Sequence, residues 1–190
     1  RAFSLDADAG DVLGEIDKLA YAYFGLSDDE IAIIEDTVST ILPALQPHEG
    51  HFPKLWNAPD ADDRARYAQT LSTSLADWFS GERIGTRLVA KGADLAILRL
   101  RLGGDEDYAE DRNGELGSVL EELSKHIHRP LDGNFQLMPD LRVFAGECLY
   151  LIKPLQLRFW LRSAALADAD EIALDLQQAI DPSPSRWSQH

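Results

Sequence analysis

Apolar residues recur at intervals of three and four along residues 11–24, which is the period of an amphipathic helix. Gly25 follows in the position of a helix C-cap. Ser27 and Glu30 then have the spacing of a capping box, so a second helix is expected from this point to just before Pro43. The short Gly-Leu-Ser connection predicts that the two helices form an antiparallel hairpin.

A proline-rich loop and a third helix at about 62–79 are expected next, and the pattern then changes. The segments 84–90 and 95–102 flank a tight turn, and the second of them alternates leucine with Arg99 and Arg101. A period of two is typical of a β-strand, so these segments predict a hairpin with one buried face and one basic face.

The second half of the chain repeats this order. A helix at about 115–128 is followed by strands at 141–144 and 148–152 and by a last helix at 163–180. Residues 155–162 fit either an extension of the strand or the start of that helix. The order favours an α+β fold, in which a mainly antiparallel sheet in two ββα units is covered by helices.

The pattern divides the chain into four parts: a helical connector (1–42), a loop and helix (43–81), an α+β domain (82–181) and a flexible C-terminal tail (182–190). The first residue is Arg1 and the only methionine is Met138. We therefore expect the chain to be a C-terminal fragment of a longer protein.

Composition is that of a globular protein, with 45% hydrophobic and 27% charged residues. The net charge of −15 repels phosphate and disfavours nonspecific nucleic-acid binding by the whole chain. Charge is unevenly distributed: residues 1–36 carry −8, whereas 83–101 carry +4 and 141–165 carry +3. An acidic N-terminal part is thus joined to a body with two basic stretches.

One cysteine, Cys148, excludes an internal disulfide and a zinc site built from several cysteines. The sequence shows neither a secretory signal nor the apolar stretch of about 18 residues that a membrane span needs. We expect a cytoplasmic bacterial protein that does not bind a membrane.

Motifs for catalysis are missing from the sequence: it has no phosphate-binding glycine loop, no Gly-x-Ser-x-Gly and no Asn/Asp-Pro-Pro-Tyr/Phe. His48 and His51 are close enough to suggest a metal site, but no third ligand lies nearby, so solvated loop histidines are the better interpretation. We predict no catalytic residue, no metal and no cofactor in this chain.

Cations and aromatic residues lie close together between Lys153 and Ser163. Arg158 and Arg162 are four residues apart and would share a helical face. One interpretation is contact with phosphates and bases. The other, which we favour, is structural, with the arginines paired to Asp168, Asp170 or Glu171. The candidate nucleic-acid contacts are Arg87, Lys91, Arg99, Arg101, Lys153, Arg158, Trp160 and Arg162.

Residues 16–31, IDKLAYAYFGLSDDEI, resemble the helical connector that follows the catalytic core of type IIG restriction enzymes and related adenine-N6 DNA methyltransferases. Ala20, Ala22 and Phe24 depart from the family pattern without disturbing the apolar face. Residues 149–171 show a fainter resemblance to C-terminal sequences of large phage-defence methylases.

The resemblance implies an accessory or target-recognition domain of a DNA methyltransferase in a restriction–modification or phage-defence system. The domain would be non-catalytic by itself, would reach DNA through its parent protein, and would leave S-adenosylmethionine to that parent. The alternative is a protein–protein interaction module that binds a partner in a defence complex.

Overall fold

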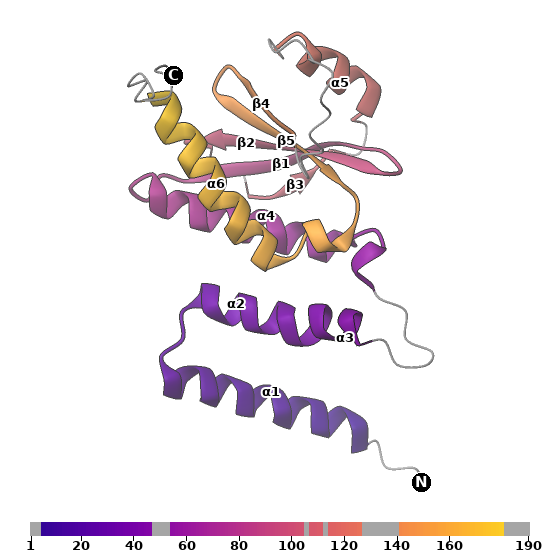
Figure 1. Ribbon diagram of the computed structural model, residues 1–190, viewed down its shortest axis with the longest axis vertical. Coiled ribbons are helices and arrows are strands. Elements are labelled where there is room, and N and C mark those ends of the chain that lie inside the picture. Colours follow the sequence, from indigo (N-terminus) through magenta and orange to yellow (C-terminus); the bar gives the residue numbers. More distant parts are fainter. Residues whose placement is uncertain (1–4, 47–53, 105–106, 112–113, 127–140, 181–190) are drawn as a thin grey trace, which may run out of the picture.

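The computed structural model describes residues 5–46, 54–104, 107–111, 114–126 and 141–180 (Figure 1). Among the sequence predictions, the tail at 182–190 and the histidines His48 and His51 lie outside the described residues.

The N-terminal part is a helical hairpin. Helix α1 (Leu5–Phe24) and helix α2 (Asp28–Asp36) are joined by a turn in which Gly25 has φ of 65°, a conformation that glycine adopts at little cost. The predicted capping box is confirmed: the Glu30 N–H donates to the Ser27 hydroxyl at 3.3 Å, and the Ser27 N–H donates to the Glu30 carboxylate at 2.8 Å.

The helix that begins with α2 does not end before Pro43, and this prediction was wrong. A π-helical turn (Thr37–Ile41) leads directly into helix α3 (Leu42–Leu45). Pro43, which has no N–H to bond to the preceding turn, closely follows the π-helical turn.

Helix α4 (Ala61–Trp78) begins at another capping box, in which the Asp63 N–H donates to the Asp60 carboxylate at 2.8 Å. A 3₁₀ turn (Lys54–Trp56) precedes it. The helix confirms the third predicted element, and its inner face contributes Tyr67, Ala68, Leu71 and Leu75 to the core.

The strands form one open, mixed sheet in the order β3-β1-β2-β5-β4. Its members are β1 (Ile84–Lys91), β2 (Leu95–Leu102), β3 (Ala109–Glu110), β4 (Leu141–Ala145) and β5 (Cys148–Pro154). All neighbouring strands are antiparallel except β3, a short edge strand that is parallel to β1. Strand β3 was not predicted from the sequence, because its segment is polar.

Helices cover both faces of the sheet (Figure 1). Helix α4 and helix α6 (Arg162–Ile180) pack on one face over a core that includes Leu98 and Leu151. Helix α5 (Leu116–Ser124) packs on the other face over Ile97 and Val143. The α+β prediction is confirmed, and β2–β5 pairing joins the two ββα units into one sheet.

Two segment predictions need refinement. The described part of α5 ends at Ser124, four residues before the predicted end. Residues 157–159 form a 3₁₀ turn (Leu157–Phe159), so this segment neither extends β5 nor belongs to α6.

Candidate functional site

The structure distributes the eight predicted nucleic-acid contacts over both faces of the sheet and does not bring them together. Arg87, Lys91, Arg99 and Arg101 lie on β1 and β2, Lys153 lies on β5, and Arg158, Trp160 and Arg162 lie in or beside the 3₁₀ turn and the start of α6.

Lys153 is part of a buried polar network and does not reach the surface. Its side chain is 2% exposed, and its Nζ donates to the Tyr67 hydroxyl at 2.9 Å and to the Asp168 carboxylate. The Tyr67 hydroxyl also donates to Asp168, which closes the network. Lys153 therefore cannot contact a phosphate in this fold. The sequence held a signal for this, because alternation along β5 places Lys153 on the same face as Leu149 and Leu151.

Trp160 is a core residue, 1% exposed, and so is not available for base stacking. Its ring centroid lies 5.1 Å from that of Tyr67, and its indole N–H donates to the Pro154 carbonyl at 2.8 Å. An aromatic ring whose N–H is satisfied in this way stabilises the core.

Arg87 and Arg99 lie opposite each other on β1 and β2, and alternation along β2 places them on the same face as Ile97, which gives this face a basic stripe. The stripe is partly neutralised. Arg87 pairs with Asp111 at 3.0 Å, and Arg101 lies 3.8 Å from Glu147. Lys91 at the end of β1 lies 3.9 Å from Glu110.

Glu110 on β3 is the centre of an ion network at the sheet edge. The buried Arg64 donates two hydrogen bonds to its carboxylate, at 2.8 and 3.1 Å, and the Tyr108 hydroxyl donates a third at 2.7 Å. Burial alone would raise the pKa of Glu110, but the hydrogen bonds from Arg64 and Tyr108 outweigh it and hold that pKa below its ordinary value. Burial and the Glu110 charge raise the pKa of Tyr108, which therefore stays a neutral donor.

Arg158 is exposed and stacks on aromatic rings. Its guanidinium carbon lies 4.1 Å from the ring centroid of Trp56 and 4.4 Å from that of Phe159. The expectation that Arg158 and Arg162 share a helical face was wrong, because Arg158 lies in the 3₁₀ turn and α6 begins only at Arg162. Trp56, from a different part of the chain, completes the stack.

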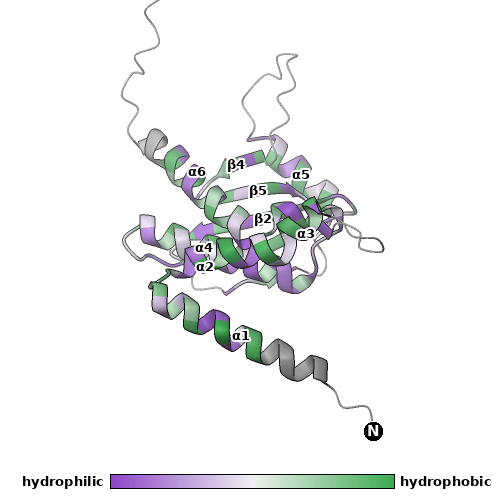
Figure 2. Cartoon of the chain, turned by 60° about the horizontal axis from the view of Figure 1, so that its bottom comes forward, coloured by the Kyte–Doolittle hydropathy of each residue, from purple (hydrophilic) through white to green (hydrophobic). Residues whose placement is uncertain are grey.

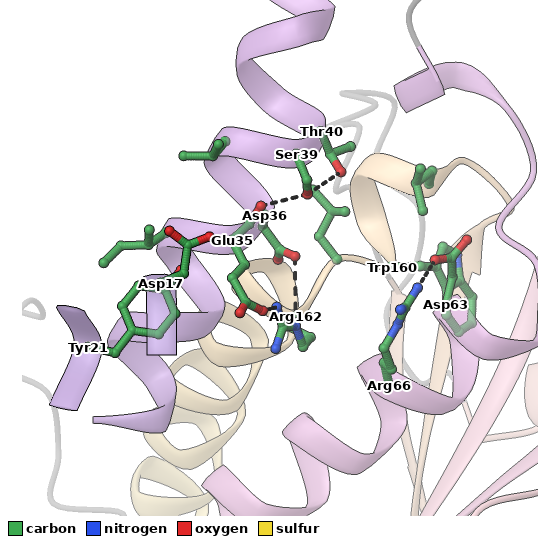
Figure 3. A pocket seen from close by; sticks show the side chains of 14 residues that line it. Asp17, Tyr21, Glu35, Asp36, Ser39, Thr40, Asp63, Arg66, Trp160 and Arg162 are labelled. Carbon is green, nitrogen blue, oxygen red and sulfur yellow. Dashed lines mark hydrogen bonds and ion pairs between the residues drawn. The ribbon is translucent and has the colours of Figure 1, made fainter. Parts of the chain in front are cut away.

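A cavity of about 470 Å³ lies between the helical hairpin and the start of α6 (Figure 3). Arg162 crosses it and pairs with Glu35 at 2.5 Å and with Asp36 at 3.8 Å. Asp36 is buried and accepts the Ser163 N–H at 2.7 Å, so a residue of α2 caps the beginning of α6. The arginine was expected to pair within its own helix, at Asp168, Asp170 or Glu171, and this prediction was wrong.

The chemistry of this cavity is that of a polar contact between elements. Asp63 and Arg66 on its α4 side pair with each other at 2.6 Å. Burial and the nearby charges of Asp17 and Glu35 raise the pKa of Tyr21, so its phenol is neutral at neutral pH and is no base. The lining includes the hydroxyl groups of Ser39 and Thr40 but no histidine that could activate either of them as a nucleophile.

Helix α1 presents the apolar face that the sequence pattern predicted, and this face is exposed. Val12, Ile16, Leu19 and Tyr23 are between 54% and 85% exposed. Figures 1 and 2 both show α1 as the outermost helix, on the side away from the sheet, and Figure 2 shows apolar residues in the part of the helix that is coloured by hydropathy. The expected antiparallel hairpin is present, but it does not bury this face.

Among the described residues, no three or more histidine, cysteine, aspartate and glutamate side chains are grouped so as to hold a metal ion. Within the same part of the chain, no helix has the length and apolar character required to cross a bilayer.

The fold and the site define a class: an α+β protein with an open, mixed five-stranded sheet and an N-terminal helical hairpin. A cavity lined by polar residues lies between the two parts. Comparison of the chain with protein-family models, curated proteins and solved structures found no match.

Proposed function

We propose that the chain is an accessory module of a bacterial adenine-N6 DNA methyltransferase, non-catalytic by itself, that works by binding a protein surface through α1. The observation that carries the binding role is the exposed apolar face of α1. The methyltransferase setting is supported by the resemblance of residues 16–31 to the connector of that family.

The geometry of α1 supports a binding role. At about 100° per residue, Val12, Ile16, Leu19 and Tyr23 fall in one stripe, and Tyr21, which lines the cavity, falls on the far side. Fully burying an aliphatic or aromatic side chain stabilises a complex by about 1.5–3 kcal/mol. Burial of four such residues in one stripe would therefore contribute about 6–12 kcal/mol before the cost of association is subtracted.

The charge distribution favours a protein partner over DNA as the direct ligand. The chain has a net charge of −15, and Lys153 and Trp160 are buried. Arg162 pairs with two carboxylates of α2. Few of the predicted contacts are therefore accessible and unneutralised, although DNA can still be reached through the parent protein.

Binding should be measured by isothermal titration of the full chain with an adenine-N6 methyltransferase core that carries Asn/Asp-Pro-Pro-Tyr/Phe. We expect the double variant Leu19→Gln/Tyr23→Gln to weaken binding at least tenfold, because it removes apolar area without changing charge. The matched control Ala22→Gln, on the same helix but outside the stripe, should bind like the unmodified chain. Unchanged affinity of the double variant, with helix content intact by circular dichroism, would refute the role of α1.

A direct DNA contact is a second candidate, favoured by the exposed Arg158 stacked on Trp56. An arginine held in this way can contact a phosphate, and each phosphate contact adds about 0.9 to the slope of log K against log salt. We expect Arg158→Gln to lower that slope by about one in a titration with duplex DNA, and Lys125→Gln at the C-cap of α5 to leave it unchanged. Equal slopes for the two variants would exclude this contact.

A further inference from the structure

We infer that the partner surface bound by α1 is apolar at its centre and bordered by lysine and arginine side chains. This inference rests on the proposed binding role of α1 and specifies the chemistry of the partner. Three observations lead to it: the width of the apolar face, the position of the acidic residues around it, and the charge of the helical hairpin.

The apolar face of α1 is wider than one stripe. Leu13 and Phe24 are also exposed and fall beside the row formed by Val12, Ile16, Leu19 and Tyr23. The Tyr23 and Phe24 rings pack edge to face with centroids 5.2 Å apart, which gives the C-terminal end of the face a fixed aromatic surface. A face of this width fits a groove or a helix of a partner.

Carboxylates border this face, and the only cation of the described hairpin lies behind it. At about 100° per residue, Glu15 falls on one border and Asp17, which also lines the cavity, on the other. Lys18 lies behind the face and reaches Glu15 at 3.5 Å, but both side chains are more than 70% exposed and such a surface pair contributes little. Asp28 and Asp29 add two exposed carboxylates in the first turn of α2. An apolar partner with basic borders would match this arrangement.

The net charge disfavours the two other usual occupants of an amphipathic helix, which are a second copy of the chain and a membrane surface. Residues 12–46 contain seven acidic residues and one lysine, a balance of −6. Two copies of the chain joined through α1 would bring two such charges together. The cytoplasmic face of a membrane is anionic and would repel the hairpin for the same reason.

The test uses two synthetic amphipathic peptides with the same leucine face, one with lysine and the other with glutamate on both borders. Fluorescence anisotropy with the full chain at low salt should show the lysine peptide binding at least tenfold more tightly. The preference should shrink as salt screens the charges. Leu19→Gln/Tyr23→Gln should abolish binding of the lysine peptide. Glu15→Gln/Asp17→Asn should keep the binding and lose most of the preference.

Equal binding of the two peptides, or binding of neither, would overturn the inference. So would concentration-dependent dimers in sedimentation equilibrium that Leu19→Gln/Tyr23→Gln abolishes, or binding of the chain to phosphatidylserine vesicles.

Failure of the proposed function gives a different result: the lysine peptide binds and the methyltransferase core does not. If the core binds with a salt-independent affinity and the peptides are not distinguished, the proposed function stands and the basic border is wrong.

Discussion

Lys153, Tyr67 and Asp168 join β5, α4 and α6 through a single buried set of polar groups. The ammonium group is almost completely removed from water, so its stability in the fold depends on the carboxylate and the hydroxyl beside it. Its place over the Tyr67 ring, 4.5 Å from Nζ to the centroid, adds a cation–π contact.

We expect Asp168→Ala to lower the free energy of unfolding by about 3–5 kcal/mol, because it leaves the buried Lys153 ammonium without its counter-charge. Urea denaturation would measure the loss. The double variant Lys153→Met/Asp168→Ala should recover at least about 1 kcal/mol of it, since no unpaired charge remains buried. A double variant less stable than Asp168→Ala would contradict the cost assigned to the unpaired Lys153 ammonium.

The Glu110 network predicts a dependence of stability on pH. The folded-state pKa of Glu110 is held below its ordinary value of 4.5, so the network stabilises the fold above that pH, and the contribution is lost as pH falls through the folded pKa. The stability difference between the unmodified chain and Glu110→Gln should therefore be largest near pH 7 and should shrink below about pH 4.3. Urea midpoints at pH 7, 5 and 3.5 would measure it, and a constant difference would contradict the assignment.

At the scale of elements, Asp36 decides how the hairpin is attached to the body. Its carboxylate caps α6 from a different helix and lies beside Arg162. The contact joins residues 127 positions apart. Pairing between α2 and α6 therefore holds the hairpin in place independently of the connection along the chain.

Replacement of Asp36 tests this attachment. Asp36→Ala should lower the free energy of unfolding by about 1–2 kcal/mol, because the first turn of α6 loses its cap. Asp36→Asn keeps an oxygen that can accept the Ser163 N–H and should cost less. Hydrogen exchange at the Ser163 amide would follow the cap directly, and equal exchange in Asp36→Ala and the unmodified chain would contradict it.

At the scale of the whole molecule, the hairpin and the body contribute differently to stability. The two buried core clusters of the described chain draw on α4, α5, α6 and the sheet, and α1 contributes no residue to either. The exposed apolar face of α1 is therefore not used in the core, and it is accessible to a binding partner.

Removal of residues 1–25 should therefore leave the body folded. The shortened chain keeps the Ser27 cap of α2. We expect its free energy of unfolding to lie within about 1 kcal/mol of that of the complete chain, because little apolar area is lost from the core. Urea denaturation followed by tryptophan fluorescence would report on the buried Trp160. A loss of several kcal/mol would show that α1 is part of the core and not a free binding surface.

The amino-acid sequence by itself determined the local elements of this protein. The capping box at Ser27 and the alternation in β2 depend on residues a few positions apart, and both predictions were confirmed. The α+β class follows from the order of these elements.

Only the tertiary structure decided which side chains are accessible. Lys153 became buried because Asp168 and Tyr67, 15 and 86 positions away, close around it. Arg162 pairs with Glu35, which lies 127 positions earlier in the chain. The exposure of α1 likewise depends on where α2 and α6 place the hairpin. Local periodicity shows that a helix has an apolar face, but only long-range packing determines whether that face is covered.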